Sequence, residues 1–376
     1  MAEGPSTGLV SSQQFREFWI LDDAQVFGGG QLIALRLARY VNESLPSCAA
    51  HVVCPRESEL AARCGAVDVL VHHATFPGFE PSAPITIPRA ALRLRHLLEG
   101  ADGSAIALGM SLRTQVYAHS ALLGMRDAPR LVHFMPEQDS ARRLTTRFVF
   151  RRNPAVVAVG ENAADAYRAR IPGVRIHVVN NFLLPEEFDD AARRVTRKPD
   201  THAPVLGVLA RLIPEKGILE AVEELASASE HWSRLLIGGQ RQDQAYVRAV
   251  QERIRQLGLI ARVRLLGRID DVSAFFDQID ALLVPSVGNE GQPVVIVEAI
   301  AHGRPVIVRE PIWSKSFGTL PVLPYRDVQG LRTALTRLPP PIESPEELKR
   351  LFGPMQAIDA IEEAAGGLGR KRHRRA

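Results

Sequence analysis

Short apolar runs rich in Val, Ile and Leu alternate with longer amphipathic stretches from about Glu17 onward. This alternation is typical of βαβ units and predicts a parallel sheet flanked by helices. In the first half of the chain, the runs that read as strands are EFWILDD, AHVVCP, VDVLVHH, SAIALGM, PRLVHFM, AVVAVG and RIHVVNN. Together they predict one complete doubly wound α/β domain.

After Asn181 the alternation stops, and the charged, proline-containing segment FLLPEEFDDAARRVTRKPDTHAP predicts a linker. A second series of strands follows: PVLGVLA, SRLLIGG, RVRLLGR, DALLVPS and PVIVRE. Helices are expected to start near Gly217, Asp243, Asp271 and Pro293. The predicted divisions are a first domain at 1–183, a linker at 184–203, a second domain at 204–345, a last helix at 346–365 that could return to the first domain, and a disordered tail at 366–376.

Two doubly wound domains that face each other place the carboxyl ends of both sheets on one cleft, where open α/β sheets bind ligands. Composition agrees with this globular organisation, because 46% of the 376 residues are hydrophobic and 23% are charged. No apolar run reaches the ~18 residues of a membrane-spanning helix, and the first residues lack the pattern of a secretion signal. We therefore expect a cytoplasmic protein. Cys48, Cys54 and Cys64 have no Cys-x-x-Cys spacing, which favours buried thiols over a disulfide or a zinc site.

The formal net charge of +4 comes from the end of the chain, where five of the last seven residues are Lys or Arg. Without them the remaining residues are nearly neutral, which gives no support to a nucleic-acid partner. A second basic stretch, SARRLTTRFVFRR, leaves peripheral contact with an anionic membrane or a lipid-linked acceptor open, although a solvated helix face is the favoured interpretation. The oligomeric state is not predicted.

Candidate chemistry begins in the second domain, where Arg211 and Lys216 flank a turn between a strand and a helix start. Two cations near the positive end of a helix dipole suit a diphosphate. An enzyme that breaks a sugar–phosphate bond without a metal must offset the charge that builds up on the diphosphate. Taken alone, these two residues are better interpreted as solvated surface charges.

The stretch PSVGNEGQPVVIVEAIAHGRPVIV favours a ligand site for those two cations over solvated surface charges. Glu290 lies in the loop after a strand, and Glu298 lies about one and a half turns into a helix that starts near Pro293. The loop carboxylate can accept hydrogen bonds from sugar hydroxyls, and the deeper one can accept both hydroxyls of a ribose. Because an unpaired charge in an apolar helix is costly, we expect a ligand to be the partner of Glu298.

The segments LARLIPEKG, LLIGG, RVRLLGRIDDV, DALLVPS and EGQPVVIVEAIAHGRPVI, in that order, resemble the nucleotide-sugar domain of the family 4 retaining glycosyltransferases. The family's E-x7-E pattern is met by Glu290 and Glu298, and the resemblance is strong over about Val205–Arg309. It implies the GT-B fold, in which two Rossmann-like domains face across a cleft. It also implies metal-independent, retaining transfer of a sugar from a UDP- or GDP-linked donor to a small-molecule, glycan or lipid-linked acceptor, without a cofactor.

The resemblance also implies roles for individual residues. Arg211 and Lys216 would hold the donor diphosphate, Glu290 the donor sugar and Glu298 the ribose. Gly267 would let the chain pass close to the base, or is a plain turn glycine. The remaining donor contacts implied in this domain are Gly291, Gln292, Pro293, Val294 and Val295.

In the first domain, Gly28-Gly29-Gly30 resembles the family's first glycine-rich loop, and Gly29 and Gly30 would lie near the donor. His133 in LVHFMPEQD would face the donor sugar as a catalytic group, together with Glu290, Lys216 and Arg211. Glu137 and Gln138 would contact the acceptor. A tight turn and a structural histidine are the alternatives. Asn181 matches a residue at the family's domain junction, and Asp271 is expected to cap a helix.

The chain departs from the family after Arg309, where it reads EPIWSKSFGTLPVLPYRD, so no contacts are transferred from that stretch. The sequence contains no Asp-x-Asp, which argues against a metal-bridged diphosphate. A phosphorylase or nucleotide-sugar epimerase of the same fold, or a catalytically silent accessory protein, remain alternatives.

Overall fold

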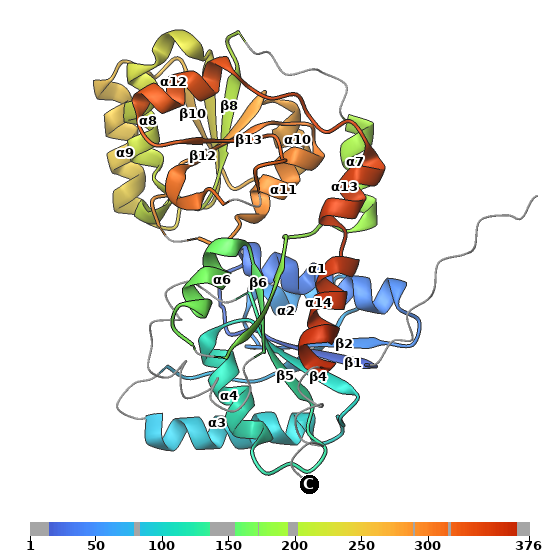
Figure 1. Cartoon of the computed structure of the whole chain (residues 1–376). Coiled ribbons are helices and arrows are strands. Elements are labelled where there is room, and N and C mark those ends of the chain that lie inside the picture. The colour runs from blue at the N-terminus through green and yellow to red at the C-terminus, as the bar shows by residue number, and fades with distance from the viewer. Residues whose placement is uncertain are drawn as a thin grey trace, which may run out of the picture.

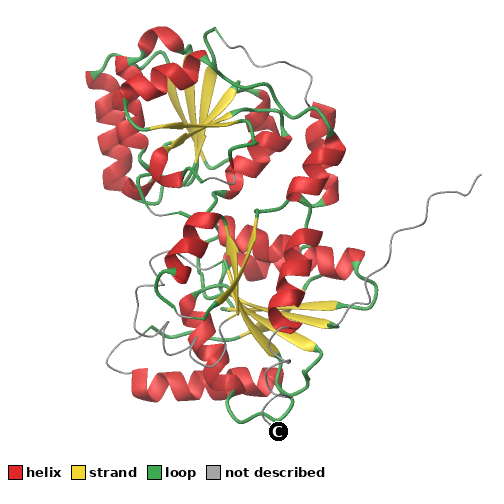
Figure 2. Ribbon diagram, viewed as in Figure 1, coloured by secondary structure: helices red, strands yellow, loops and turns green. Residues whose placement is uncertain are grey.

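The computed structural model describes residues 15–78, 83–135, 155–171, 173–194, 202–288, 290–314 and 317–366. The described chain folds into two domains, each a parallel sheet with helices on both faces (Figures 1 and 2). The fold class is therefore α/β, with the two doubly wound domains that the sequence predicts. Among the residues described, no helix combines the length and the apolar character that crossing a bilayer would need.

The first domain contains all seven strands that were predicted from the apolar runs. Its strands are β1 (Glu17–Leu21), β2 (Ala49–Cys54), β3 (Leu70–His73), β4 (Ala105–Gly109), β5 (Arg130–Phe134), β6 (Ala155–Val159) and β7 (Arg175–Val179), in the spatial order β3-β2-β1-β4-β5-β6-β7. Its helices are α1 (Gly29–Ser44), α2 (Glu59–Gly65), α3 (Ala83–Leu98), α4 (Leu112–Leu122) and α6 (Glu161–Arg168). The strand order reverses between β1 and β4, which opens a crevice at their carboxyl ends.

The second domain has a six-stranded sheet in the order β10-β9-β8-β11-β12-β13. Its strands are β8 (Val205–Leu209), β9 (Arg234–Gly238), β10 (Val263–Gly267), β11 (Ala281–Val284), β12 (Val306–Arg309) and β13 (Val322–Tyr325), and its helices are α8 (Ile218–Ser227), α9 (Gln244–Gln256), α10 (Val272–Asp277), α11 (Val294–Ala301) and α12 (Val328–Thr336). Sequence reasoning missed β13. This strand contains Pro324, which an edge strand tolerates because one side of its backbone forms no ladder.

The four helix starts expected in this domain are those of the structure. Gly217 precedes α8 in the left-handed conformation, with φ of 62°, where a side chain would also collide with the carbonyl oxygen of Pro285. Asp243 accepts from the backbone of α9, and Asp271 accepts from the N–H of Ala274 in α10. Polar caps thus fix where the helices begin, and with them the loops at the carboxyl ends of the strands.

The connection between the domains differs in detail from the expectation. The stretch expected to be a linker carries a helix, α7 (Pro185–Arg194). The last helix is divided at Gly353-Pro354 into α13 (Pro345–Phe352) and α14 (Met355–Gly366), because proline interrupts helical hydrogen bonding. Helix α13 packs against α7, and α14 packs on β5, β6 and β7 of the first sheet (Figure 1). The chain therefore passes between the domains twice.

Candidate active site

Lys216 and Glu290 meet where the strand order of the second sheet reverses. Lys216 follows β8 and Glu290 follows β11, and these two strands are neighbours at the reversal. The Lys216 Nζ lies 2.7 Å from the Glu290 Oε2, and the two side chains are 18% and 23% exposed. An accessible ion pair at the topological switch point is where a ligand of an open α/β sheet is expected.

Backbone hydrogen bonds hold the two loops together. The N–H groups of Val287 and Gly288 both donate to the carbonyl oxygen of Glu215, at 3.0 and 3.1 Å. Lys216 is the last residue of a short 3-10 turn that leads into Gly217. The two residues of the ion pair therefore lie on loops that are hydrogen-bonded to each other, which limits the movement of both charged groups.

The loop after Glu290 is anchored on the first domain. Asn181, which is fully buried, donates from its backbone N–H to the Gln292 Oε1 and from its side-chain amide to the Gln292 carbonyl oxygen. The Gln292 Nε2 donates to the Asn180 Oδ1 at 3.0 Å. At Gly291, a Cβ would come within 2.6 Å of the Val159 carbonyl oxygen at the end of β6. Gln292, expected to contact the donor, thus uses its side chain to join the domains.

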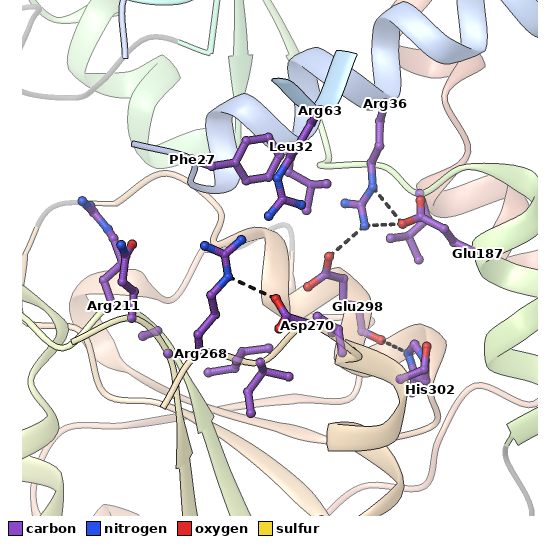
Figure 3. A pocket seen from close by; sticks show the side chains of 18 of the residues that line it. Phe27, Leu32, Arg36, Arg63, Glu187, Arg211, Arg268, Asp270, Glu298 and His302 are labelled. Carbon is purple, nitrogen blue, oxygen red and sulfur yellow. Dashed lines mark hydrogen bonds and ion pairs between the residues drawn. The ribbon is translucent and has the colours of Figure 1, made fainter. Parts of the chain in front are cut away.

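A cavity of about 560 Å³ lies between the domains. Phe27, Arg36 and Arg63 line it from the first domain, and Arg211, Arg268 and Glu298 line it from the second (Figure 3). Of the four charged residues predicted to bind the donor, the cavity lining includes Arg211 and Glu298, whereas Lys216 and Glu290 form the separate pair described above.

The lining of this cavity carries charges of both signs, with six carboxylates beside four arginines. Four arginines line it, and the side chains of Arg211, Arg268 and Arg63 extend toward the space between the domains (Figure 3). The Arg268 guanidinium forms an ion pair with Glu59 of the first domain at 2.7 Å. The Arg63 guanidinium lies 4.0 Å from the centre of the Phe27 ring, a cation–π contact. Arg211 donates to the Gln242 Oε1 at 3.1 Å.

Glu298 has a protein partner in place of the expected ligand. The NH2 group of Arg36, on α1, donates to the Glu298 Oε1 at 2.8 Å and to the Glu187 Oε1 at 2.6 Å (Figure 3). Burial disfavours the charged guanidinium, but Glu298 and Glu187 outweigh burial, so the pKa of Arg36 lies above its ordinary value. No ligand is therefore needed to compensate the buried charge of Glu298, because an ion pair across the cleft already does so.

Sequence reasoning missed Arg36, although the sequence holds a signal for it. Within α1 the buried positions include Ile33, Leu37 and Val41, and Arg36 lies on the same apolar stripe. A charged residue on the buried face of a helix needs a partner, so its position indicated a buried ion pair or a ligand. The same reasoning did not reveal which residue would pair with it, because that residue comes from another domain.

The glycine-rich loop of the first domain meets α11 of the second. A Cβ on Gly29 would lie 3.1 Å from the Val294 Cγ2, whereas Gly30 has no atom within 4 Å of its Cβ position. The Gln31 side chain accepts from the Gly28 N–H at 3.1 Å and donates to the Asp22 Oδ2 at 2.9 Å. Burial raises the pKa of the Asp22 carboxyl to about 6.

Other predicted residues lie apart from the cavity. His133 is fully buried in β5, where its ring packs edge-on against that of Tyr167, with the two ring centres 5.9 Å apart. Burial lowers the pKa of His133 to about 3. Gly267, with φ of 79°, ends β10 just before the cavity residue Arg268. Pro293 is the N-cap of α11, and Val295 lies in its first turn. Glu137, Gln138 and the basic stretch SARRLTTRFVFRR lie outside the described residues.

The fold is shared with glycosyltransferases of the GT-B class. The structure of the Anabaena protein HepE in complex with UDP superposes with a TM-score of 0.71 at 18% identity, covering 94% of this chain and 99% of that one. The sucrose-phosphate synthase of Thermosynechococcus elongatus has a TM-score of 0.68 at 16% identity, covering 96% of this chain and 100% of that one. At these identities the likeness defines the fold alone.

The second domain matches a family model. Residues 203–337 match the model of the glycosyl transferases group 1 family, so the chain carries a group 1 glycosyltransferase domain. It is 29% identical over 175 residues to the 2-deoxystreptamine glucosyltransferase of Streptomyces kanamyceticus, a match that spans 43% of each protein. It is 31% identical over 101 residues to the phosphatidyl-myo-inositol mannosyltransferase of Mycobacterium leprae (strain TN), spanning 26% of this chain and 25% of that protein.

Proposed function

We propose that this protein is a retaining, metal-independent glycosyltransferase that takes a hexose from a UDP- or GDP-linked donor. The observation that carries the proposal is the Lys216–Glu290 pair at the switch point of a group 1 glycosyltransferase domain, next to a cavity lined by Arg211 and Glu298. The GT-B structure of HepE was obtained with UDP and with UDP-glucose, which supports a nucleotide sugar as the donor class.

In this proposal the donor lies along the cleft from the cavity to the ion pair. The nucleoside occupies the cavity, with its ribose hydroxyls donating to Glu298. The diphosphate lies between Arg211 and Lys216, and Glu290 accepts from the hydroxyls of the donor sugar. Lys216 then turns from Glu290 toward the phosphate oxygens, a small movement because its side chain has several rotatable bonds.

The chemistry follows from the charges. As the bond between the anomeric carbon and the diphosphate oxygen breaks, its electron pair stays on the diphosphate, and the two cations offset the growing charge. An acceptor hydroxyl attacks the anomeric carbon from the face that the diphosphate leaves, so the configuration is retained. Its proton passes to the departing diphosphate oxygen, which balances the step without a metal ion or a protein nucleophile.

The acceptor is proposed to bind on the first domain, near the glycine-rich loop, with Glu137 and Gln138 as its candidate contacts. A small molecule, a glycan or a lipid-linked sugar are the acceptor classes in question. A cytoplasmic protein with peripheral contact to the inner membrane face is the corresponding proposal for its location.

The test is release of UDP or GDP from a panel of nucleotide sugars, measured with and without candidate acceptors. Lys216→Ala and Glu290→Gln should each lower turnover by about 100-fold or more, since each removes charge stabilisation or sugar positioning in a desolvated site. Lys349→Ala is the matched control, because that lysine pairs with Asp189 on the exposed surface at 3.0 Å.

Full activity in either site variant contradicts the assignment of its residue. If wild-type protein binds UDP or GDP but transfers no sugar from any donor in the panel, the catalytically silent accessory protein is the better interpretation. If phosphate or water replaces the acceptor, the phosphorylase alternative or a hydrolase is indicated instead.

A further inference from the structure

The buried ion pair between Arg36 and Glu298 joins the two domains at the nucleoside end of the proposed donor site. We propose that Arg36 is a positioning residue of this site: from the first domain it orients the Glu298 carboxylate for the ribose hydroxyls, so that ribose recognition depends on domain closure. This inference rests on the proposed function, because it requires a nucleotide in the cavity.

Arg36 is held firmly on its own side of the cleft. Its side chain is 4% exposed, its Nε and NH2 groups both donate to the Glu187 Oε1, and its NH1 group donates to the Phe182 carbonyl oxygen at 3.4 Å. Glu187 belongs to α7, and Phe182 follows β7 at the junction. The guanidinium is therefore a fixed anchor rather than a mobile surface charge.

The same anchor determines where the Glu298 carboxylate points. Only the Oε1 atom of Glu298 is used by Arg36, and the Oε2 atom has no hydrogen-bonding partner among the described residues. Arg36 and Glu298 both line the cavity, as does Glu187. Two carboxylates and one guanidinium leave one negative charge in excess, which hydroxyl donors complement and an additional anion does not.

A planar guanidinium suits this task because it can donate to two carboxylates at once from fixed directions. Since Arg36 comes from the first domain and Glu298 from the second, opening of the cleft separates them. The carboxylate then loses its orientation at the moment the nucleotide leaves. Arg36 thereby links closure of the cleft to the affinity for ribose, while the phosphates are held by other residues.

The experiment compares UDP and GDP with their 2′,3′-dideoxy forms by titration calorimetry. The dissociation constant of the dideoxy form divided by that of the ribonucleotide measures what the ribose hydroxyls contribute to binding. A hydrogen bond to a charged group predicts a ratio of roughly 10 to 100 for wild-type protein. Arg36→Met and Glu298→Gln should each reduce the ratio to within about threefold of one, and the double variant should reduce it no further.

Arg39→Met is the matched control, since Arg39 lies on the same helix and pairs with Glu186 of α7 at 2.7 Å. Glu186 belongs to the cavity lining, whereas Arg39 does not, and among the described residues Arg39 pairs with neither Glu187 nor Glu298. It should keep the wild-type ratio. Arg36→Lys keeps the charge but lacks the planar fork, so it should lower the ratio by about threefold or more; this variant decides the matter if Arg36→Met does not fold, as judged by circular dichroism.

The outcomes separate the two proposals. If the wild-type protein binds the ribonucleotide with a clear ratio and the Arg36 variants retain that ratio, the positioning role is refuted and the proposed function stands. If the wild-type protein binds neither UDP nor GDP, the proposed function fails, and the role of Arg36 fails with it.

Discussion

A single methyl group added at Gly291 tests whether the first domain positions the loop that carries Glu290. Gly291 follows Glu290 directly, and a Cβ there would lie 2.6 Å from the Val159 carbonyl oxygen. Ordinary carbon–oxygen contacts are about 3.3 Å or longer, so the loop must retreat by roughly 0.7 Å in a Gly291→Ala variant. No left-handed backbone is required at Gly291, so the effect is steric rather than conformational.

The retreat displaces Glu290 from the position in which it meets Lys216. Because a displacement of about 1 Å can lower the rate about 100-fold, we expect turnover to fall by roughly 10- to 50-fold. The fold should lose about 1–3 kcal/mol, the usual cost of overpacking. The measurements are kcat and KM for nucleotide-sugar turnover, with thermal unfolding in parallel.

Gly100→Ala is the control, because its Cβ would meet no atom within 4 Å and Gly100 lies outside the cavity lining. Its activity should be close to that of the wild type. If Gly291→Ala transfers sugar at the wild-type rate, the position of the Glu290 loop does not depend on its contact with β6, and the reasoning fails.

Three further predictions concern stability and metals. Asp22 has a pKa of about 6 in the fold against an ordinary 3.8, so its contribution to stability is present below pH 4 and is lost as the pH rises through 6. In urea unfolding, the stability of Asp22→Asn relative to the wild type should therefore increase by up to about 3 kcal/mol over that pH range. A difference in stability between the two proteins that does not change with pH would contradict the burial argument. Asn181→Ala orphans the Gln292 carbonyl and should cost about 1–3 kcal/mol, whereas an unchanged melting curve would show that the junction does not need this bond. EDTA should leave turnover unaltered, and a loss that Mg²⁺ restores would refute metal independence.

The sequence predicted the strands well because parallel strands buried on both faces are short, continuous apolar runs. All seven strands of the first sheet and five of the second were found in this way. The exception, β13, is an edge strand that contains a proline, and such a strand lacks the continuous run. Likewise, the caps Asp243 and Asp271 were readable because capping depends on residues only two or three positions apart.

The candidate site was less accessible to sequence reasoning, because its decisive contacts join residues far apart in the chain. The spacing of Glu290 and Glu298 is local, but nothing local shows that Glu298 pairs with Arg36, 262 positions away. The same holds for Arg268 and Glu59, and for Gln292 and Asn181, 111 positions apart. Each pair joins the two domains, so its partner is chosen by how the domains pack rather than by any helix or strand period.

The position of α14 has a consequence for how this protein forms during translation. Ile358, Ile361 and Ala365 on this helix belong to the buried core of the first domain, although the ribosome makes them only after the second domain. The first sheet is thus complete at β7 long before the helix that covers part of it exists. The apolar surface of the first sheet that α14 covers therefore stays exposed in the nascent chain until the entire second domain has been synthesised.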